Sequence, residues 1–156
     1  MKFEHLVEIN DLSNPDAAVL SREELWFGLL CRAEDARAFL PGLETCTIIE
    51  RSTDELVREL NFGAAVIRDR VRLCELEWIR FESEATAEHA GGSLTISIEE
   101  PEPGLLFLRF RYATSLPEMP GSEEAQYADI VRSAYHQSDL DTVKVIRMIA
   151  ESGRLQ

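Results

Sequence analysis

Two oppositely charged residues interrupt the apolar positions of adjacent segments. Arg58 does so within residues 55–62, and Asp69 does so within residues 65–74. A turn at residues 63–64 would place the two side chains directly opposite each other, because antiparallel partners keep a constant index sum. We therefore predict an ion pair that faces inward. Two roles are open for it: a structural pair that fixes strand register, or a site that binds a carboxylate, hydroxyl or carbonyl group of a ligand.

Further polar residues occupy positions that the same alternation assigns to the inner face. A histidine can act as a general base near neutral pH, and a tyrosine can polarise a ligand carbonyl. The alternative is that the aromatic rings belong to the core, with their polar ends hydrogen-bonded there. The candidate ligand-binding residues, besides Arg58 and Asp69, are His5, Phe81, Ser83, Phe110, Tyr112, Tyr127, Val131 and Tyr135.

The sequence contains no pattern typical of a metal, nucleotide or serine-hydrolase site. Cys31, Cys46 and Cys74 are far apart and lie among apolar residues, so we interpret them as buried thiols. The histidines lack the paired spacing of metal ligands. Glycine-rich phosphate loops and the Gly-x-Ser-x-Gly elbow are absent. We therefore expect neither a metal ion nor a cofactor.

The composition excludes several classes of partner. The 156 residues include 29 acidic and 16 basic side chains, which give a formal net charge of -13. This charge opposes binding to nucleic acid or to anionic membrane surfaces. No apolar run is long enough to insert into a bilayer, and the first residues lack the apolar core of a signal peptide. We expect one cytoplasmic domain that spans residues 1–156.

The apolar periodicity predicts a strand, two short helices, six strands and one long helix. The first strand is predicted at residues 2–10. Ser21 and Glu24 have capping-box spacing at the start of the first helix, and residues 33–40 are expected to form the second. A period of two then predicts six consecutive strands, at residues 44–51, 55–62, 65–74, 78–85, 93–99 and 105–114.

The long helix is predicted over residues 122–153, with Ser122 as its N-cap and Gly153 as a left-handed residue at its C-terminal end. Asp139 falls largely outside the expected buried stripe of this helix. The stripe comprises Tyr127, Val131, Ala134, Tyr135, Ser138, Thr142, Val145 and Ile149. We expect this stripe to form one wall of a pocket that faces Arg58 and Asp69.

This order of elements resembles the START and birch-pollen-allergen (SRPBCC) superfamily, whose helix-grip fold wraps a seven-stranded sheet around a long C-terminal helix. The opening Phe3-Glu4-His5, the charged segment 66–71 and the segment 127–135 look most like its AtaL-like branch. The resemblance implies an α+β fold with a cavity for a hydrophobic or amphipathic small molecule. Superfamily members include lipid carriers, hormone receptors, polyketide aromatase/cyclases and co-chaperone domains, so the fold does not decide the activity.

Three functions follow as hypotheses. The first is binding of a small hydrophobic or amphipathic molecule, with little or no catalysis. The second is a cyclase or dehydratase that uses His5, Asp69 or a tyrosine as acid or base. The third is a protein-interaction module that uses the outer sheet face, including formation of a homodimer.

Overall fold

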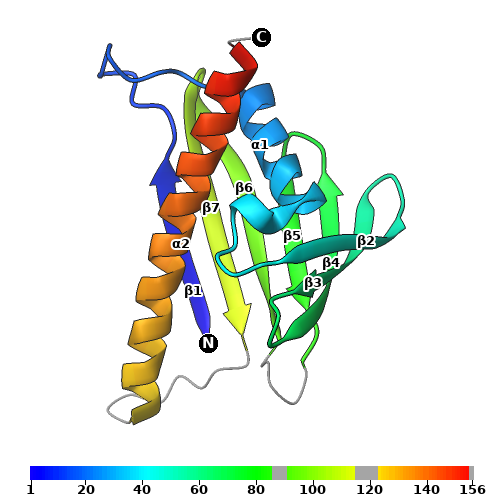
Figure 1. Cartoon of the computed structure of the whole chain (residues 1–156). Helices are drawn as coiled ribbons and strands as arrows, with labels where there is room; N and C mark the ends of the chain where they lie inside the picture. The colour runs from blue at the N-terminus through cyan, green and yellow to red at the C-terminus, as the bar shows by residue number, and fades with distance from the viewer. Residues whose placement is uncertain (86–90, 115–122, 155–156) are drawn as a thin grey trace.

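The computed structural model describes residues 1–85, 91–114 and 123–154. In this part of the chain, seven antiparallel strands form one curved sheet, and two α-helices lie against its concave side (Figure 1). The helices are α1 (Arg22–Glu34) and α2 (Glu123–Arg154). The strands are β1 (Lys2–Glu8), β2 (Thr45–Arg51), β3 (Glu55–Asn61), β4 (Val66–Cys74), β5 (Trp78–Ser83), β6 (Gly92–Glu102) and β7 (Leu105–Thr114), in the order β1-β7-β6-β5-β4-β3-β2. The predicted helix-grip architecture is therefore confirmed.

The strand register agrees with the constant index sum expected for the hairpin between β3 and β4. Arg58 pairs with Asp69, and Leu60 pairs with Ile67. The backbone N–H of Phe62 donates to the carbonyl of Ala65 at 2.8 Å, which closes the turn. This register places one set of side chains from both strands on the concave face.

Helix α1 begins as predicted and ends differently. Ser21 is its N-cap: the Ser21 hydroxyl accepts from the N–H of Glu24, and the Glu24 carboxylate accepts from the N–H of Ser21, both at 3.0 Å. The helix continues to Glu34, so the second short helix lies within the predicted residues 33–40 but is shorter than predicted. Asp35 adopts extended backbone and its carboxylate accepts from the N–H of Arg37, which leaves only the short 3₁₀ turn η1 (Ala36–Ala38).

Helix α2 also differs at its C-terminal end. The proposed N-cap, Ser122, lies outside the described residues. Gly153 is helical rather than left-handed, and the helix runs on to Arg154. The Arg154 guanidinium donates to the carboxylate of Glu24 and to the carbonyl of Val19, at 2.7 and 2.6 Å. These contacts hold the last turn of the helix against the chain that leads into α1.

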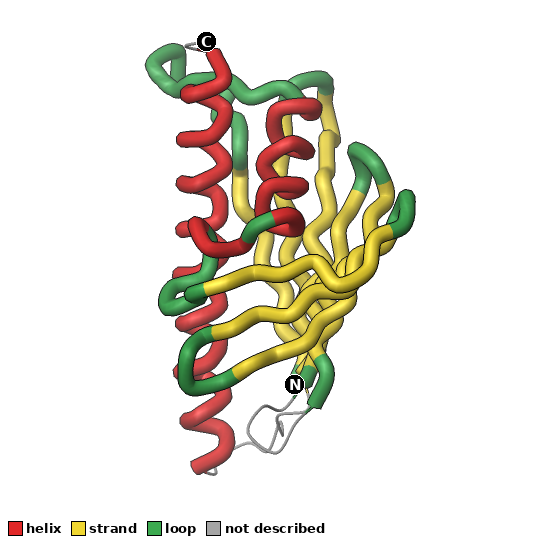
Figure 2. Tube along the Cα trace, turned by 45° about the vertical axis from the view of Figure 1, so that its right-hand side comes forward, coloured by secondary structure: helices red, strands yellow, loops and turns green. Residues whose placement is uncertain are grey.

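The main core fills the part of the concavity beneath α1 and the C-terminal half of α2. Figure 2 shows these two helical segments side by side over the sheet. Gly28 allows the two helices to approach closely, because a Cβ atom at this position would lie 2.6 Å from Cγ2 of Ile146. Helix α2 is rotated relative to the predicted stripe, so that Tyr127 is 56% exposed whereas Asp139 is 1% exposed. The buried residues of α2 are Ala128, Asp139, Thr142, Val143, Ile146 and Ala150. Neither described α-helix combines the length and apolar character needed to cross a membrane.

Candidate functional site

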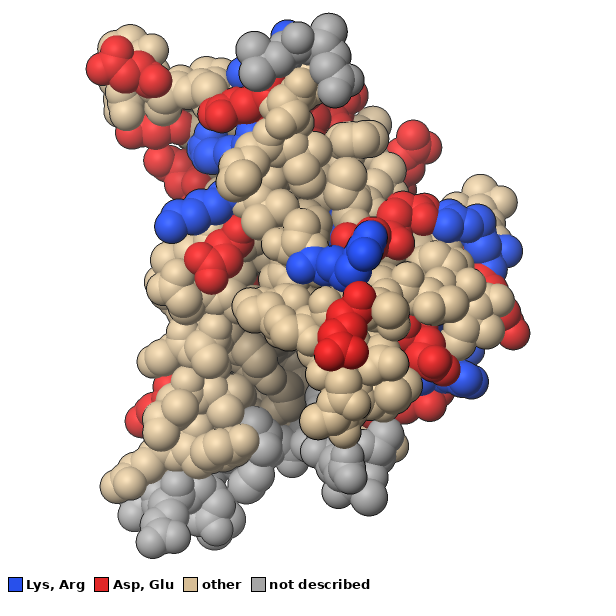
Figure 3. All heavy atoms as spheres, viewed as in Figure 1, with Lys and Arg blue, Asp and Glu red and all other residues tan. Residues whose placement is uncertain are grey.

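A cavity of about 180 Å³ occupies the part of the concavity that the main core leaves open. In Figure 3 the surface is hollowed between α2 and the β2–β3 side of the sheet. Apolar, hydroxyl and charged side chains all contribute to the wall. The lining residues are Arg32, Leu40, Arg58, Leu60, Asp69, Phe81, Ser83, Gly91, Gly92, Ser93, Leu94, Tyr112, Thr114 and Tyr135.

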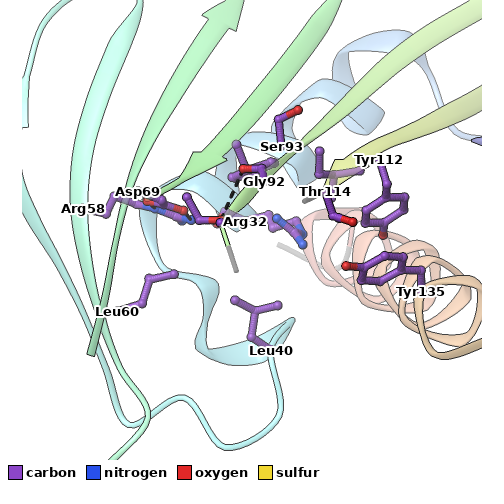
Figure 4. A pocket seen from close by; sticks show the side chains of 14 residues that line it. Arg32, Leu40, Arg58, Leu60, Asp69, Gly92, Ser93, Tyr112, Thr114 and Tyr135 are labelled. Atoms are coloured by element: carbon purple, nitrogen blue, oxygen red, sulfur yellow. Dashed lines mark hydrogen bonds and ion pairs between the residues drawn. The ribbon is translucent and has the colours of Figure 1, made fainter. Parts of the chain in front are cut away.

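The predicted inward ion pair is present on one side of this cavity (Figure 4). The Arg58 guanidinium donates to both carboxylate oxygens of Asp69, from Nε at 2.8 Å and from Nη2 at 2.6 Å. Arg58 is 1% exposed and Asp69 is 5% exposed. Nη1 of Arg58 donates to the carbonyls of Arg32 and Ala33, at 2.9 and 3.0 Å. Arg58 therefore satisfies two carbonyls at the C-terminal end of α1, which the helix itself leaves unpaired.

Arg32 is a second buried arginine, and unlike Arg58 it has a guanidinium nitrogen that forms no hydrogen bond with the described residues. Its side chain is carried by the last turns of α1 and is buried against the Phe81 ring, whose centroid lies 4.3 Å from the guanidinium carbon. Nε of Arg32 is buried and has no hydrogen-bond partner among the described residues. Burial lowers the pKa of Arg32 to about 10, so the side chain remains charged at neutral pH. The cavity therefore contains a cation without a carboxylate partner in the described part of the chain.

A hydrogen-bonded cluster on the α2 side of the cavity joins Tyr112, Asp139 and His5. The Tyr112 hydroxyl donates to Oδ1 of Asp139, and Nδ1 of His5 lies 3.2 Å from Oδ2 of the same carboxylate. Burial raises the pKa of the Asp139 carboxyl, while the hydrogen bonds from Tyr112 and His5 oppose the increase. Burial and the negative charge of Asp139 raise the pKa of the Tyr112 hydroxyl. This hydroxyl is thereby kept in its protonated form.

Aromatic rings enclose this cluster. The Tyr135 ring stacks on the Tyr112 ring with centroids 4.0 Å apart and planes 3° apart. On the far side of Asp139, the His5 ring lies 3.9 Å from the His136 ring. In Figure 4 the Tyr135 hydroxyl points toward the cavity. Tyr112 and Tyr135 therefore form one wall of the cavity, whereas His5 lies behind that wall.

Six of the ten ligand-binding residues predicted from the sequence line the cavity, and four, including His5, do not. Arg58, Asp69, Phe81, Ser83, Tyr112 and Tyr135 line the cavity. Phe110 is completely buried in the core, and Val131 is half-buried on α2 outside the cavity lining. Tyr127 is exposed and does not line the cavity, because the rotation of α2 turns its ring outward. Contact between the lining residues and a ligand remains a prediction.

The sequence interpretation missed Arg32 and Asp139, although the spacing of both residues contained a signal. Arg32 follows Leu25 by seven residues and Leu29 by three, so it belongs to the apolar face of α1. Asp139 precedes Thr142 by three residues and Ile146 by seven, and it shares the buried face of α2. The charge of Asp139 suggested a solvent-exposed position.

The described residues contain no group of three or more His, Cys, Asp or Glu side chains that could hold a metal ion. The three cysteines are free and partly buried. Burial raises the pKa of the Cys31 thiol, which makes it a poor nucleophile. The chemistry available to the cavity therefore lies in its arginines, hydroxyls and carboxylates.

Comparison with known families and structures places the chain among proteins of related fold. The family model for AtaL, described as acetylaranotin biosynthesis cluster protein L, matches residues 7–153. No curated protein matches the chain by sequence.

Three solved structures illustrate the structural likeness. The Zhui aromatase/cyclase from Streptomyces sp. R1128 has a TM-score of 0.63 and 16% identity, over 100% of this chain and 96% of that chain. The di-domain ARO/CYC protein StfQ from the steffimycin biosynthetic pathway has a TM-score of 0.73 and 11% identity, over 99% of this chain and 52% of that chain. Ara h 8.0201 has a TM-score of 0.63 and 13% identity, over 97% of this chain and 98% of that chain. At these identities, the comparisons show a shared fold.

Proposed function

This chain belongs to the AtaL family, and on that premise we propose that it binds a small amphipathic molecule in the cavity between the sheet and its helices. The observation that carries the proposal is the mixed lining of this cavity. Leu40, Leu60 and Leu94 supply apolar surface, while arginine and hydroxyl groups supply a few polar contacts. The volume of about 180 Å³ is suited to a compact ligand.

The structural neighbours support the same proposal at the level of fold. Two of the three proteins named above are called aromatase/cyclases or ARO/CYC proteins. Since one fold can host unrelated functions, the likeness supports a cavity-based function without identifying the ligand. The choice of ligand depends on the side chains of this chain.

Native mass spectrometry of gently purified protein tests the proposal. We expect a small molecule retained at one copy per chain. Leu40→Trp places bulk in the cavity wall and should abolish retention, whereas Leu12→Trp, at an exposed loop position, should preserve it. Retention that is equal in both variants would locate the molecule elsewhere, and the absence of both a retained molecule and binding by added aromatic probes would refute the proposal.

A second candidate function is acid–base catalysis of a cyclisation. It is favoured by the cluster in which Tyr112, at the cavity wall, is linked through Asp139 to the half-buried His5. Such a chain can pass a proton between a bound carbonyl compound and the imidazole.

Heptane-2,4,6-trione provides a model substrate for this second function. Its terminal methyl carbon bonds to the distant carbonyl carbon, one water molecule leaves, and tautomerisation gives 3,5-dihydroxytoluene. We expect the protein to accelerate this reaction relative to buffer and Asp139→Asn to lose roughly 100-fold in rate. The exposed Asp129→Asn on the same helix is the control. A rate equal to that in buffer, or equal in wild type and Asp139→Asn, would exclude this function.

A further inference from the structure

We infer that the molecule bound in the cavity is an organic anion and that Arg32 pairs with its ionised oxygen atoms. This inference rests on the proposed binding function and specifies the chemical class of the ligand. It predicts a carboxylate, or an equivalent oxyanion, attached to a compact apolar or aromatic body.

The first argument is the hydrogen-bonding state of Arg32. The side chain is only 6% exposed, and its buried Nε lacks a partner among the described residues. Burying a charged group without a partner is costly in free energy, so buried arginines are normally paired. Arg58 shows the usual arrangement in the same cavity, because it donates to Asp69 and to two backbone carbonyls. An anionic ligand would give Arg32 the partner that Arg58 already has.

The second argument is the charge balance of the lining. Its charged members are Arg32, Arg58 and Asp69. Asp69 is neutralised by Arg58 at 2.6 Å. The next carboxylate, Asp139, accepts from Tyr112 and is 3.2 Å from His5. The lining residues themselves thus carry one net positive charge, which the nearby Asp139 offsets in part without forming an ion pair with Arg32, although the chain as a whole has a net charge of -13.

The third argument is the shape of the surroundings. The Phe81 ring lies beneath both guanidinium groups, 4.3 Å from that of Arg32 and 5.2 Å from that of Arg58. In Figure 4, Arg32 lies between the Arg58–Asp69 pair and the two tyrosines. Leu40 and Leu60 border the same space. A planar guanidinium held over an aromatic ring beside apolar side chains suits a carboxylate on a hydrophobic body.

Isothermal titration calorimetry with a matched probe pair tests this inference. 2-Naphthoate and 2-naphthamide have nearly the same shape and differ in charge. We expect the wild-type protein to bind the carboxylate about 10- to 100-fold more tightly than the amide, as for a hydrogen bond to a charged group. Arg32→Met should remove this preference by weakening naphthoate binding, with little change for the amide. Arg32→Gln serves as a second variant in case the methionine variant does not fold.

An arginine on the outer sheet face provides the control variant. Arg68→Met removes the same charge from the outer face, where the side chain is half-exposed beside Glu59, and should preserve the preference. Equal wild-type affinity for the two probes, or a preference that survives in both Arg32 variants, would overturn the anion inference while leaving the binding function intact. If neither probe binds and the purified protein retains no molecule, both proposals fail.

Discussion

At the scale of single residues, the two buried arginines of the cavity have opposite energetic roles. Each N atom of the Arg58 guanidinium donates to Asp69 or to a carbonyl of α1, whereas Nε of Arg32 has no partner among the described residues. Removing one partner of a buried ion pair leaves the other charge uncompensated, while removing an unpaired charge relieves that cost. The same substitution at the two positions should therefore have different effects on stability.

We predict that Arg58→Met lowers the free energy of unfolding by about 3–5 kcal/mol, because Asp69 and the two helix carbonyls lose their donor. Urea-induced unfolding measures the loss. The double variant Arg58→Met with Asp69→Leu should recover part of it. Arg32→Met is the matched control and should leave stability unchanged or increase it. An equal loss at positions 32 and 58 would contradict this account of the two arginines.

The Asp139 carboxyl should make stability depend on pH. Burial raises its folded-state pKa above the ordinary value of 3.8. Between the ordinary and the raised value, the folded state binds more protons than the unfolded state, so the free energy of unfolding falls as pH rises through this window. The Asp139→Asn variant has no carboxyl group to titrate at this position, so its free energy of unfolding lacks this decrease. The stability of Asp139→Asn relative to wild type should therefore increase from about pH 4 to neutral pH, as measured by urea unfolding. A constant difference would contradict the raised pKa.

The sequence predicted some residues of the candidate site and not others, for a physical reason. Arg58 and Asp69 could be paired because strand register is set by a turn and an alternation of period two. Asp139 and Arg32 were missed because helical periodicity locates a face but does not show which charged residues on it are buried. Their burial depends on how α1 and α2 pack against the sheet and each other, which is a tertiary property.

At the scale of elements, the close contact between α1 and α2 depends on a glycine, which has no side chain. Gly28 lies so close to Ile146 that a Cβ atom would be 2.6 Å from Cγ2. The sequence predicted both helices and the capping box at Ser21 without indicating this contact. The end of α2 was likewise unpredictable from local signals, because Arg154 is held by Glu24 and Val19, which are far away in the sequence.

We predict that Gly28→Ala destabilises the protein by about 1 kcal/mol, since overpacking exceeds the gain in helix propensity. Thermal unfolding followed by circular dichroism measures the change. Gly153→Ala, also in a helix but with open space around it, should be neutral or stabilising. Combining Gly28→Ala with Ile146→Ala should cost less than the sum of the single changes. Strict additivity would show that the two residues do not clash.

At the scale of the whole molecule, net charge and local ion pairs have opposite effects on the stability of the folded state. The formal charge of -13 produces long-range repulsion. On the outer sheet face, arginines and glutamates from neighbouring strands pair locally, such as Arg68 of β4 with Glu59 of β3 at 3.6 Å. Exposed pairs of this kind contribute little to stability. Repulsion should therefore dominate the response of the protein to salt.

We predict that the thermal unfolding midpoint rises when sodium chloride is increased from low concentration to about 0.15 M, where the Debye length is about 8 Å. The reason is that screening weakens the repulsion among the excess carboxylates. Differential scanning calorimetry measures the midpoint. A fall with added salt would mean that the outer-face ion pairs contribute more to stability than the net charge removes.

The hydrogen bonds from Arg58 to the carbonyls of Arg32 and Ala33 have an evolutionary consequence. The side chain at position 58 anchors the backbone from which the side chain at position 32 projects. The two positions are therefore epistatic: a change at 58 that releases the end of α1 also alters the effect of any residue at 32. Selection of variants for a new ligand should recover substitutions at these positions together rather than singly.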